Sequence, residues 1–158
     1  MEAKPLKFIA DAMLGRLAKW LRILGHDVVY DVSVSDNDLI ARALDEQRVI
    51  LTMDRELAGR KSAKNSLCIR SDDYKEQLRE VVVRYNIDCT SRIFTRCLAC
   101  NERLETVNKE KIRDKVPQYI YSVHDAFYIC QHCDRVYWAG SHRNSILVKL
   151  KEILPGMK

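Results

Sequence analysis

Short apolar segments alternate with amphipathic helical patterns through the first 85 residues, and this alternation is the strongest constraint on the fold. Strands are predicted over 7–10, 26–31, 48–54 and 66–70. Helices are predicted over 13–24, 35–47 and 71–85, with a basic turn or short helix over 55–65. Strands that alternate with helices favour right-handed crossovers and a parallel sheet, so we expect an α/β fold.

The predicted helices carry apolar residues at the spacing of one buried face. The first would end at Gly25 and bury Leu14, Leu17, Ala18, Leu21 and Leu24, and the second would bury Leu39, Ile40, Ala43 and Leu44. Ser35 and Asp38 stand in the positions of a capping box at the start of the second helix. Both faces predict helices that pack on a sheet.

Two Cys-x-x-Cys pairs follow this region: Cys97 with Cys100, and Cys130 with Cys133. Four thiolates at this spacing form a complete ligand set for tetrahedral Zn²⁺. A closed site of this kind is structural, because a short module has too small a hydrophobic core to fold without a cross-link such as a bound metal. Asn101 and Asp134 follow the two pairs, and both residue types tolerate the left-handed backbone of such turns.

The change of pattern near residue 86 predicts how the chain is divided. We expect an α/β domain over 1–91, a zinc-ribbon module over 92–146 and a C-terminal helix or tail over 147–158. Between the cysteine pairs we expect a short basic helix ended by Pro117, then a strand with Tyr119 and Tyr121. Aromatic residues of this module could stack on bases, but most are expected to fill its core.

Charge and hydropathy limit the environment and the partners. The chain has a formal net charge of +5, which fits a polyanionic partner as well as a plain solubility charge. No segment is apolar enough to span a bilayer, and the opening MEAKPLKF lacks the hydrophobic run of a signal peptide. Unpaired thiols are typical of reducing compartments, so we expect an intracellular, cytoplasmic protein.

Aspartates recur where the predicted strands end. Asp11 and Asp54 follow the first and third strands, Asp36 begins the helix after the second, and Asp72 and Asp73 follow the fourth. The carboxyl ends of parallel strands lie at one edge of a sheet, where α/β proteins build their sites. Carboxylates that converge repel one another unless a cation neutralises them, and Mg²⁺ or Mn²⁺ prefers oxygen ligands. A metal held in this way could support phosphodiester hydrolysis. Helix N-capping is the alternative explanation for these acids.

Basic residues follow the same aspartates and could bind phosphate. Candidate RNA contacts are Arg16, Arg55, Arg60 and Lys61, with His142 in the second half of the chain; Lys19 and Arg22 lie on the same helix as Arg16. Arg16 stands about one helical turn after Asp11, so it could reach the same edge of the sheet. The alternative is a set of solvated surface charges.

Six stretches taken together resemble the Mut-seven C-terminal ribonuclease domain family. They are FIADAMLGRLAKWLRILGHDVVY, SDNDLIARALDEQRVILTMDREL, SDDYKEQLREV, FTRCLACN, RDKVPQYIYSVHDAFYIC and CDRVYWAGSHR, and they cover almost all of 7–143 in order. The resemblance implies a PIN-like α/β domain fused to a zinc ribbon and metal-dependent RNA cleavage. It assigns the catalytic acids to Asp11, Asp36, Asp54 and one of Asp72 and Asp73.

Two functional hypotheses follow. The first is a Mg²⁺- or Mn²⁺-dependent ribonuclease that cleaves single-stranded RNA, alone or as the RNase domain of a larger RNA-processing exoribonuclease, with structural Zn²⁺. The second is a non-catalytic module of the same fold that binds RNA and docks a protein partner or a covalently linked exonuclease domain. The retained acids favour the first hypothesis, because a pure RNA binder gains nothing from repelling phosphate.

Overall fold

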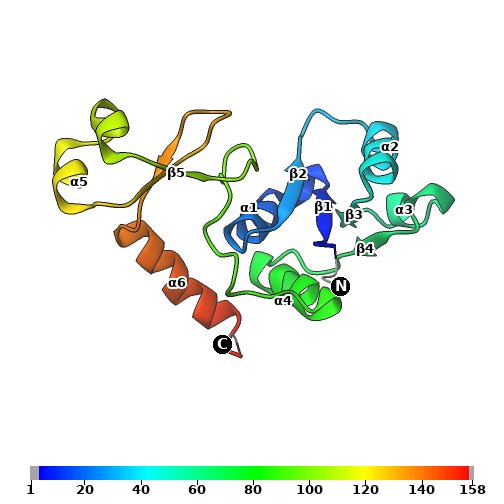
Figure 1. Cartoon of the computed structure of the whole chain (residues 1–158). Coiled ribbons are helices and arrows are strands. Elements are labelled where there is room, and N and C mark those ends of the chain that lie inside the picture. The colour runs from blue at the N-terminus through cyan, green and yellow to red at the C-terminus, as the bar shows by residue number, and fades with distance from the viewer. Residues whose placement is uncertain (1–3, 157–158) are drawn as a thin grey trace.

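A parallel four-stranded sheet forms the centre of the first half of the chain in the computed structural model, which describes residues 4–156 (Figure 1). Its strands are β1 (Lys7–Ala10), β2 (Asp27–Tyr30), β3 (Val49–Thr52) and β4 (Ser66–Cys68), in the order β2-β1-β3-β4. Every neighbouring pair is parallel, which confirms the predicted α/β fold class.

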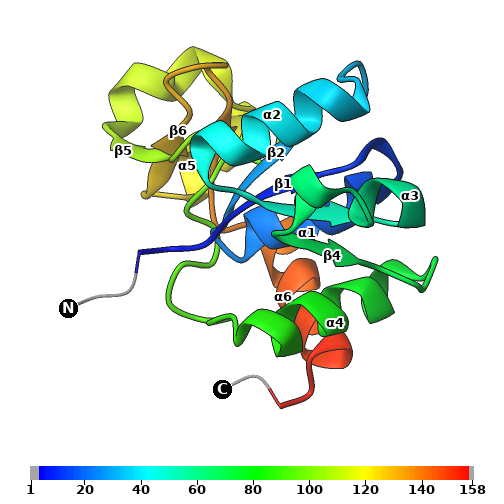
Figure 2. The same cartoon turned by 90° about the vertical axis from the view of Figure 1, so that its right-hand side faces the viewer.

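Helices follow the strands as the alternation predicts. They are η1 (Ala12–Leu14), α1 (Gly15–Ile23), α2 (Asp36–Glu46), α3 (Arg55–Ala58), η2 (Lys61–Ala63) and α4 (Tyr74–Tyr85), where η marks a 3-10 helix. Figure 2 shows α2 on one side of the sheet and α4 on the other. Successive residues of a strand point to opposite faces. Phe8 and Ala10 accordingly pack with α1 and α4, and Ile9 packs with α2 and α3.

The predicted buried faces agree with the structure except at one position. Leu14, Leu17, Ala18, Leu21 and Leu24 are all buried. On α2, Leu39, Ile40 and Ala43 are buried, but the prediction for Leu44 is wrong because its side chain is 63 % exposed. The face of α2 that meets the sheet includes Ala43, and Leu44 lies about 100° further round the helix.

The second half of the chain builds a smaller antiparallel sheet. It consists of β5 (Glu105–Val107), β6 (Phe127–Ile129) and β7 (Val136–Tyr137), in the order β5-β6-β7. The predicted basic helix is the 3-10 segment η3 (Lys109–Lys115). The predicted strand through Tyr119 and Tyr121 is wrong: these residues lie in the helix α5 (Gln118–Val123). Pro117 caps this helix, where its fixed φ and missing N–H suit a helix start as well as a strand edge.

The last helix, α6 (Ser141–Ile153), leaves the small sheet and returns to the first half of the chain (Figure 1). Its residues Ile146, Leu150 and Ile153 belong to the same buried cluster as Leu78 of α4. Arg79 of α4 also donates a hydrogen bond to the carbonyl oxygen of Ile153, at 2.6 Å. The C-terminal helix therefore holds the small sheet close to the large one.

Candidate functional site

Asp11 and Asp54 follow β1 and β3, which are neighbours in the sheet, and a buried threonine links them. Thr52 is 0 % exposed. Its hydroxyl donates a hydrogen bond to Oδ2 of Asp11 at 2.9 Å and accepts one from the backbone N–H of Asp54 at 3.0 Å. The Thr52 hydroxyl thus connects the side chain of Asp11 to the backbone of Asp54 at the carboxyl edge of the sheet.

Both aspartates are also helix N-caps, as the alternative explanation holds. Oδ1 of Asp11 accepts from the N–H of Ala12 at 2.7 Å, and Oδ1 of Asp54 accepts from the N–H groups of Glu56 and Leu57 at 2.9 and 3.3 Å. Capping occupies one oxygen of each carboxylate. Within residues 4–156, neither aspartate forms an ion pair and Oδ2 of Asp54 accepts no hydrogen bond. The pair therefore keeps oxygen atoms that could bind a cation.

The other predicted acids lie on the same edge but are less closely associated. Asp36 begins α2 and lies 3.8 Å from the guanidinium of Arg60. Asp73 caps α4 by accepting from the N–H of Lys75 at 3.0 Å, and Asp72 is exposed. In the described part of the chain, Asp11 and Asp54 do not combine with a third acid into a compact group of three ligands.

Asp31 is a further acid at this edge, and it is not among the acids predicted from the sequence. It follows β2 directly, as Asp11 follows β1, so the same positional signal could have identified it. Oδ1 of Asp31 accepts hydrogen bonds from the hydroxyl and the N–H of Ser33, and these bonds hold the pKa of the exposed carboxyl below its usual range. Every strand of the parallel sheet is thus followed by an aspartate.

The predicted phosphate contacts divide into free and engaged side chains. Arg16 lies 4.5 Å from the ring centre of Tyr74, which itself stacks on Trp20, so Arg16 lies where α4 begins. Arg55 borders a small hollow together with Arg70, and Lys61 is exposed on η2. Arg60 is engaged, because it binds Asn37 and Asp36, and Arg22 is buried. His142 lies on α6, away from the aspartates.

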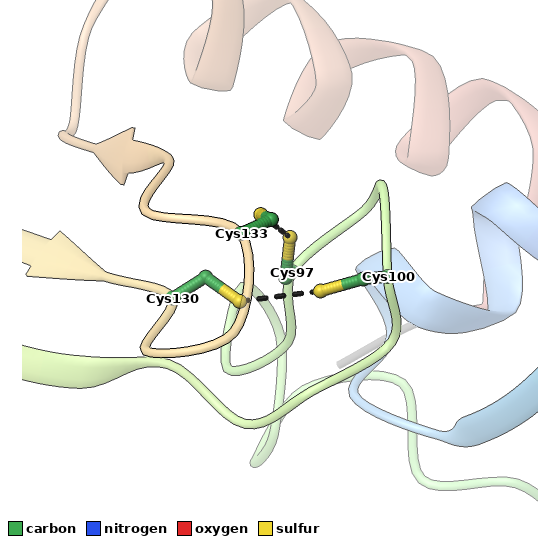
Figure 3. Close-up of side chains that lie close together, drawn as sticks. All are labelled: Cys97, Cys100, Cys130 and Cys133. Atoms are coloured by element: carbon green, nitrogen blue, oxygen red, sulfur yellow. Dashed lines mark hydrogen bonds between the residues drawn. The ribbon is translucent and has the colours of Figure 1, made fainter.

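The four paired cysteines meet in space. Their sulfur atoms all lie within 4.8 Å of one another, with 3.6 Å between Cys97 and Cys133 and 3.2 Å between Cys100 and Cys130 (Figure 3). Four sulfurs at about 2.3 Å from a tetrahedral Zn²⁺ would be about 3.8 Å apart, so the donor set fits this ion. Cys97 and Cys130 are buried, which suits a closed structural site.

Hydrogen bonds prepare Cys97 to bind as a thiolate. Burial opposes ionisation of the Cys97 thiol. Hydrogen bonds from the Tyr137 hydroxyl, at 3.1 Å, and from the N–H groups of Cys100 and Ala99 outweigh this effect, and the pKa of Cys97 falls to about 6. Burial and the neighbouring thiols raise the pKa of Cys100 to about 12. The cluster therefore disfavours a second negative charge, which a divalent cation would neutralise.

The first cysteine pair is held directly against the large sheet. Arg22, 8 % exposed, donates to the carbonyl oxygens of Val28 and Leu98 at 2.8 and 3.0 Å. Asn101 accepts from the N–H of Val28 at 2.9 Å and donates to Asp27 at 2.7 Å. The expected left-handed backbone is confirmed, with φ of 72° at Asn101 and 64° at Asp134.

Comparison with known protein families identifies the family of this chain. Residues 6–150 match the Mut7-C RNAse domain. The chain belongs to this family. Membership in an RNase domain family implies RNA as the partner. No curated protein matches the chain. Among the described residues, no helix of this Mut7-C domain has the length and hydrophobicity needed to cross a membrane.

Proposed function

We propose that this Mut7-C domain is a Mg²⁺- or Mn²⁺-dependent ribonuclease that hydrolyses phosphodiester bonds of single-stranded RNA, alone or within a larger RNA-processing enzyme. The observation that supports it is the Thr52 hydroxyl, which joins Asp11 to Asp54 at the carboxyl edge of the sheet. A threonine with no exposed surface that binds the carboxylate of Asp11 and the backbone N–H of Asp54 at the same time is more than helix capping requires.

Asp11 and Asp54 would hold the metal. Mg²⁺ is commonly bound by one or two carboxylates, with water and substrate phosphate as the other ligands, so a third acid is not required. When bound, such a metal supplies Lewis acidity toward the phosphate and an activated water. Thr52 fixes the orientation of Asp11, because its hydroxyl proton is directed at Oδ2 of that carboxylate.

The remaining edge residues would position water and RNA. Asp36 and one of Asp72 and Asp73 would orient water from the flanks of the metal, as outer groups commonly do. Arg16 and Arg55 would hold phosphate, since a guanidinium forms two parallel hydrogen bonds to phosphate oxygens. Asp36 and Arg60 already balance each other's charge, so this pair is suited to orientation rather than to metal binding.

The test compares RNA cleavage by matched variants. Zinc-loaded protein is incubated with labelled single-stranded RNA and Mn²⁺, and the double variant Asp11→Asn with Asp54→Asn is treated in the same way. Asp45→Asn with Asp114→Asn is the control, because both residues are exposed and the charge change is equal. We expect cleavage by the wild type and the control only. Equal cleavage by the Asp11/Asp54 variant would exclude this site.

The second candidate function is a non-catalytic module that binds RNA and docks a protein. It is favoured by one observation: both aspartates are N-caps, so capping alone could account for their presence. The same assay separates the two functions. RNA that stays bound and intact with Mn²⁺ and the wild-type protein would support the module.

We further propose that Cys97, Cys100, Cys130 and Cys133 hold one structural Zn²⁺. The sulfur cluster supports this, since four thiolates leave no open coordination position for catalysis. Elemental analysis of the purified protein should find one zinc per chain. Protein that is folded and free of zinc would contradict the assignment.

A further inference from the structure

A large groove lies between the small sheet, α1 and α6. Its volume is about 1070 Å³, and its walls are formed by Lys19 of α1 and by some of the residues in 93–104, 119–128 and 135–146, the last of which leads into α6. Figure 1 shows the small sheet and α6 on either side of this region, with α1 next to it. The groove is separate from the acidic edge of the sheet.

The lining of the groove is basic and contains no acidic side chain. Its cations are Lys19, Arg96, Arg135 and Arg143, with His124 and His142 beside them. Asp and Glu together make 22 of the 158 residues of the chain, so their absence from a lining of this size is a marked asymmetry. A concave surface of one charge concentrates ligands of the opposite charge.

Two of these cations are free to bind. Lys19 and Arg135 are exposed, and within residues 4–156 neither side chain forms a hydrogen bond or an ion pair. Arg143 lies over the ring of Phe94 at 4.7 Å, which still leaves the edge of its guanidinium for a ligand. Arg96 instead donates to the backbone oxygens of Gly25 and Asn101, so its role is structural.

The groove also offers flat apolar surface. Tyr119 is 73 % exposed and Val123 is 51 % exposed. These residues are four apart on α5, so they lie on one face of the helix. Tyr137 and Trp138 also form part of the wall, but the Tyr137 hydroxyl is hydrogen-bonded to Cys97 and the Trp138 ring packs against the ring of Phe127. An exposed tyrosine beside free cations is the combination that binds single-stranded nucleic acid, because bases stack on the ring while cations contact the backbone.

We propose that this groove binds single-stranded RNA and that α1 leads the strand to the acidic edge. Lys19 in the groove and Arg16 near the edge are one helical turn apart, and Asp11 precedes the same helix. Binding in the groove stands without catalysis. Only the path toward Asp11 rests on the function proposed above.

The test measures RNA binding in buffer without Mg²⁺ or Mn²⁺, on zinc-loaded protein. The groove variants are Lys19→Ala with Arg135→Ala, and Tyr119→Ala alone. The control is Lys149→Ala with Lys151→Ala, which removes two exposed cations of α6 outside the groove. Affinity for an oligouridine should fall about fivefold or more with Tyr119→Ala. The charge variant should weaken binding and lower the slope of log affinity against log salt by about 1.4, whereas the control leaves both unchanged.

The outcomes separate this proposal from the catalytic one. Unchanged affinity in both groove variants, or an equal loss in the control, would overturn it. Dimers of the wild type that Tyr119→Ala disrupts, with RNA binding unchanged, would also overturn it and assign the groove to a contact between copies. RNA that binds in the groove but is never cleaved would leave the groove standing and refute the ribonuclease.

Discussion

Asn101 joins the four-cysteine module to the large sheet, and its replacement should destabilise the whole chain. Its side chain accepts from the N–H of Val28 and donates to Asp27, which is itself bound by Arg48. Asn101→Gly keeps the left-handed backbone and removes both hydrogen bonds. The bond to the carboxylate contributes about 1.5–3 kcal/mol and the bond to the N–H about 0.5–1.5 kcal/mol, so we expect a loss of about 2–4.5 kcal/mol.

Asp134 provides the matched control, because it occupies the same position in the second cysteine pair. Its backbone has the same left-handed conformation, but its side chain is exposed and, among residues 4–156, pairs with Lys115 alone. Asp134→Gly should therefore change the free energy of unfolding by about 1 kcal/mol or less. Alanine at either position should cost about 1 kcal/mol more than glycine, since alanine resists this conformation.

The assay is urea unfolding of the zinc-loaded protein, followed by far-UV circular dichroism and by tryptophan fluorescence. Trp20 lies in the core of the large sheet and Trp138 lies in the four-cysteine module, so fluorescence reports on both parts. We expect one transition that shifts to lower urea with Asn101→Gly. Equal effects of Asn101→Gly and Asp134→Gly would show that the Asn101 side chain does not stabilise the fold, because the loss would then come from the glycine itself.

Three further predictions follow from buried polar groups. Thr52→Val should lower Mn²⁺-dependent RNA cleavage by about 10- to 100-fold, through misplacement of Asp11, while the zinc content stays constant. Burial lowers the pKa of His26, whose two nitrogens lack hydrogen-bond partners among the described residues. Because the unfolded chain then takes up the proton more readily than the folded one, the free energy of unfolding should fall as the pH drops below about 6.5. Thermal unfolding of His26→Leu should not show this pH dependence. A chelator that removes zinc should unfold the ribbon and shift the fluorescence of Trp138, and unchanged fluorescence would contradict a structural role.

Features with a local cause could be predicted from the sequence. The strands and helices of the first half follow from hydrophobic periodicity, and the clustering of four cysteines follows from two cysteine spacings. The placement of Asp11 and Asp54 at the same edge of the sheet follows from topology, since parallel strands end at one edge. The role of Thr52 could not be predicted, because threonine is common in β-strands for its strand propensity alone.

Features that depend on distant contacts could not be predicted in this way. The burial of Arg22 arises because carbonyl oxygens of Val28 and Leu98 accept its hydrogen bonds, and Leu98 is far from it in sequence. The alternation of Tyr119 and Tyr121 suggested a strand, but the chain turns into α5 after Pro117 and only Tyr121 packs on the ribbon core. The groove likewise exists only because α6 returns to the first core.

The most direct test of the central claim is Mn²⁺ binding to zinc-loaded protein without RNA, followed by electron paramagnetic resonance. We predict that the wild type and the Asp45→Asn/Asp114→Asn control bind one Mn²⁺ that the Asp11→Asn/Asp54→Asn variant does not bind. Equal Mn²⁺ binding by all three proteins, or none by the wild type, would contradict a metal site at Asp11 and Asp54.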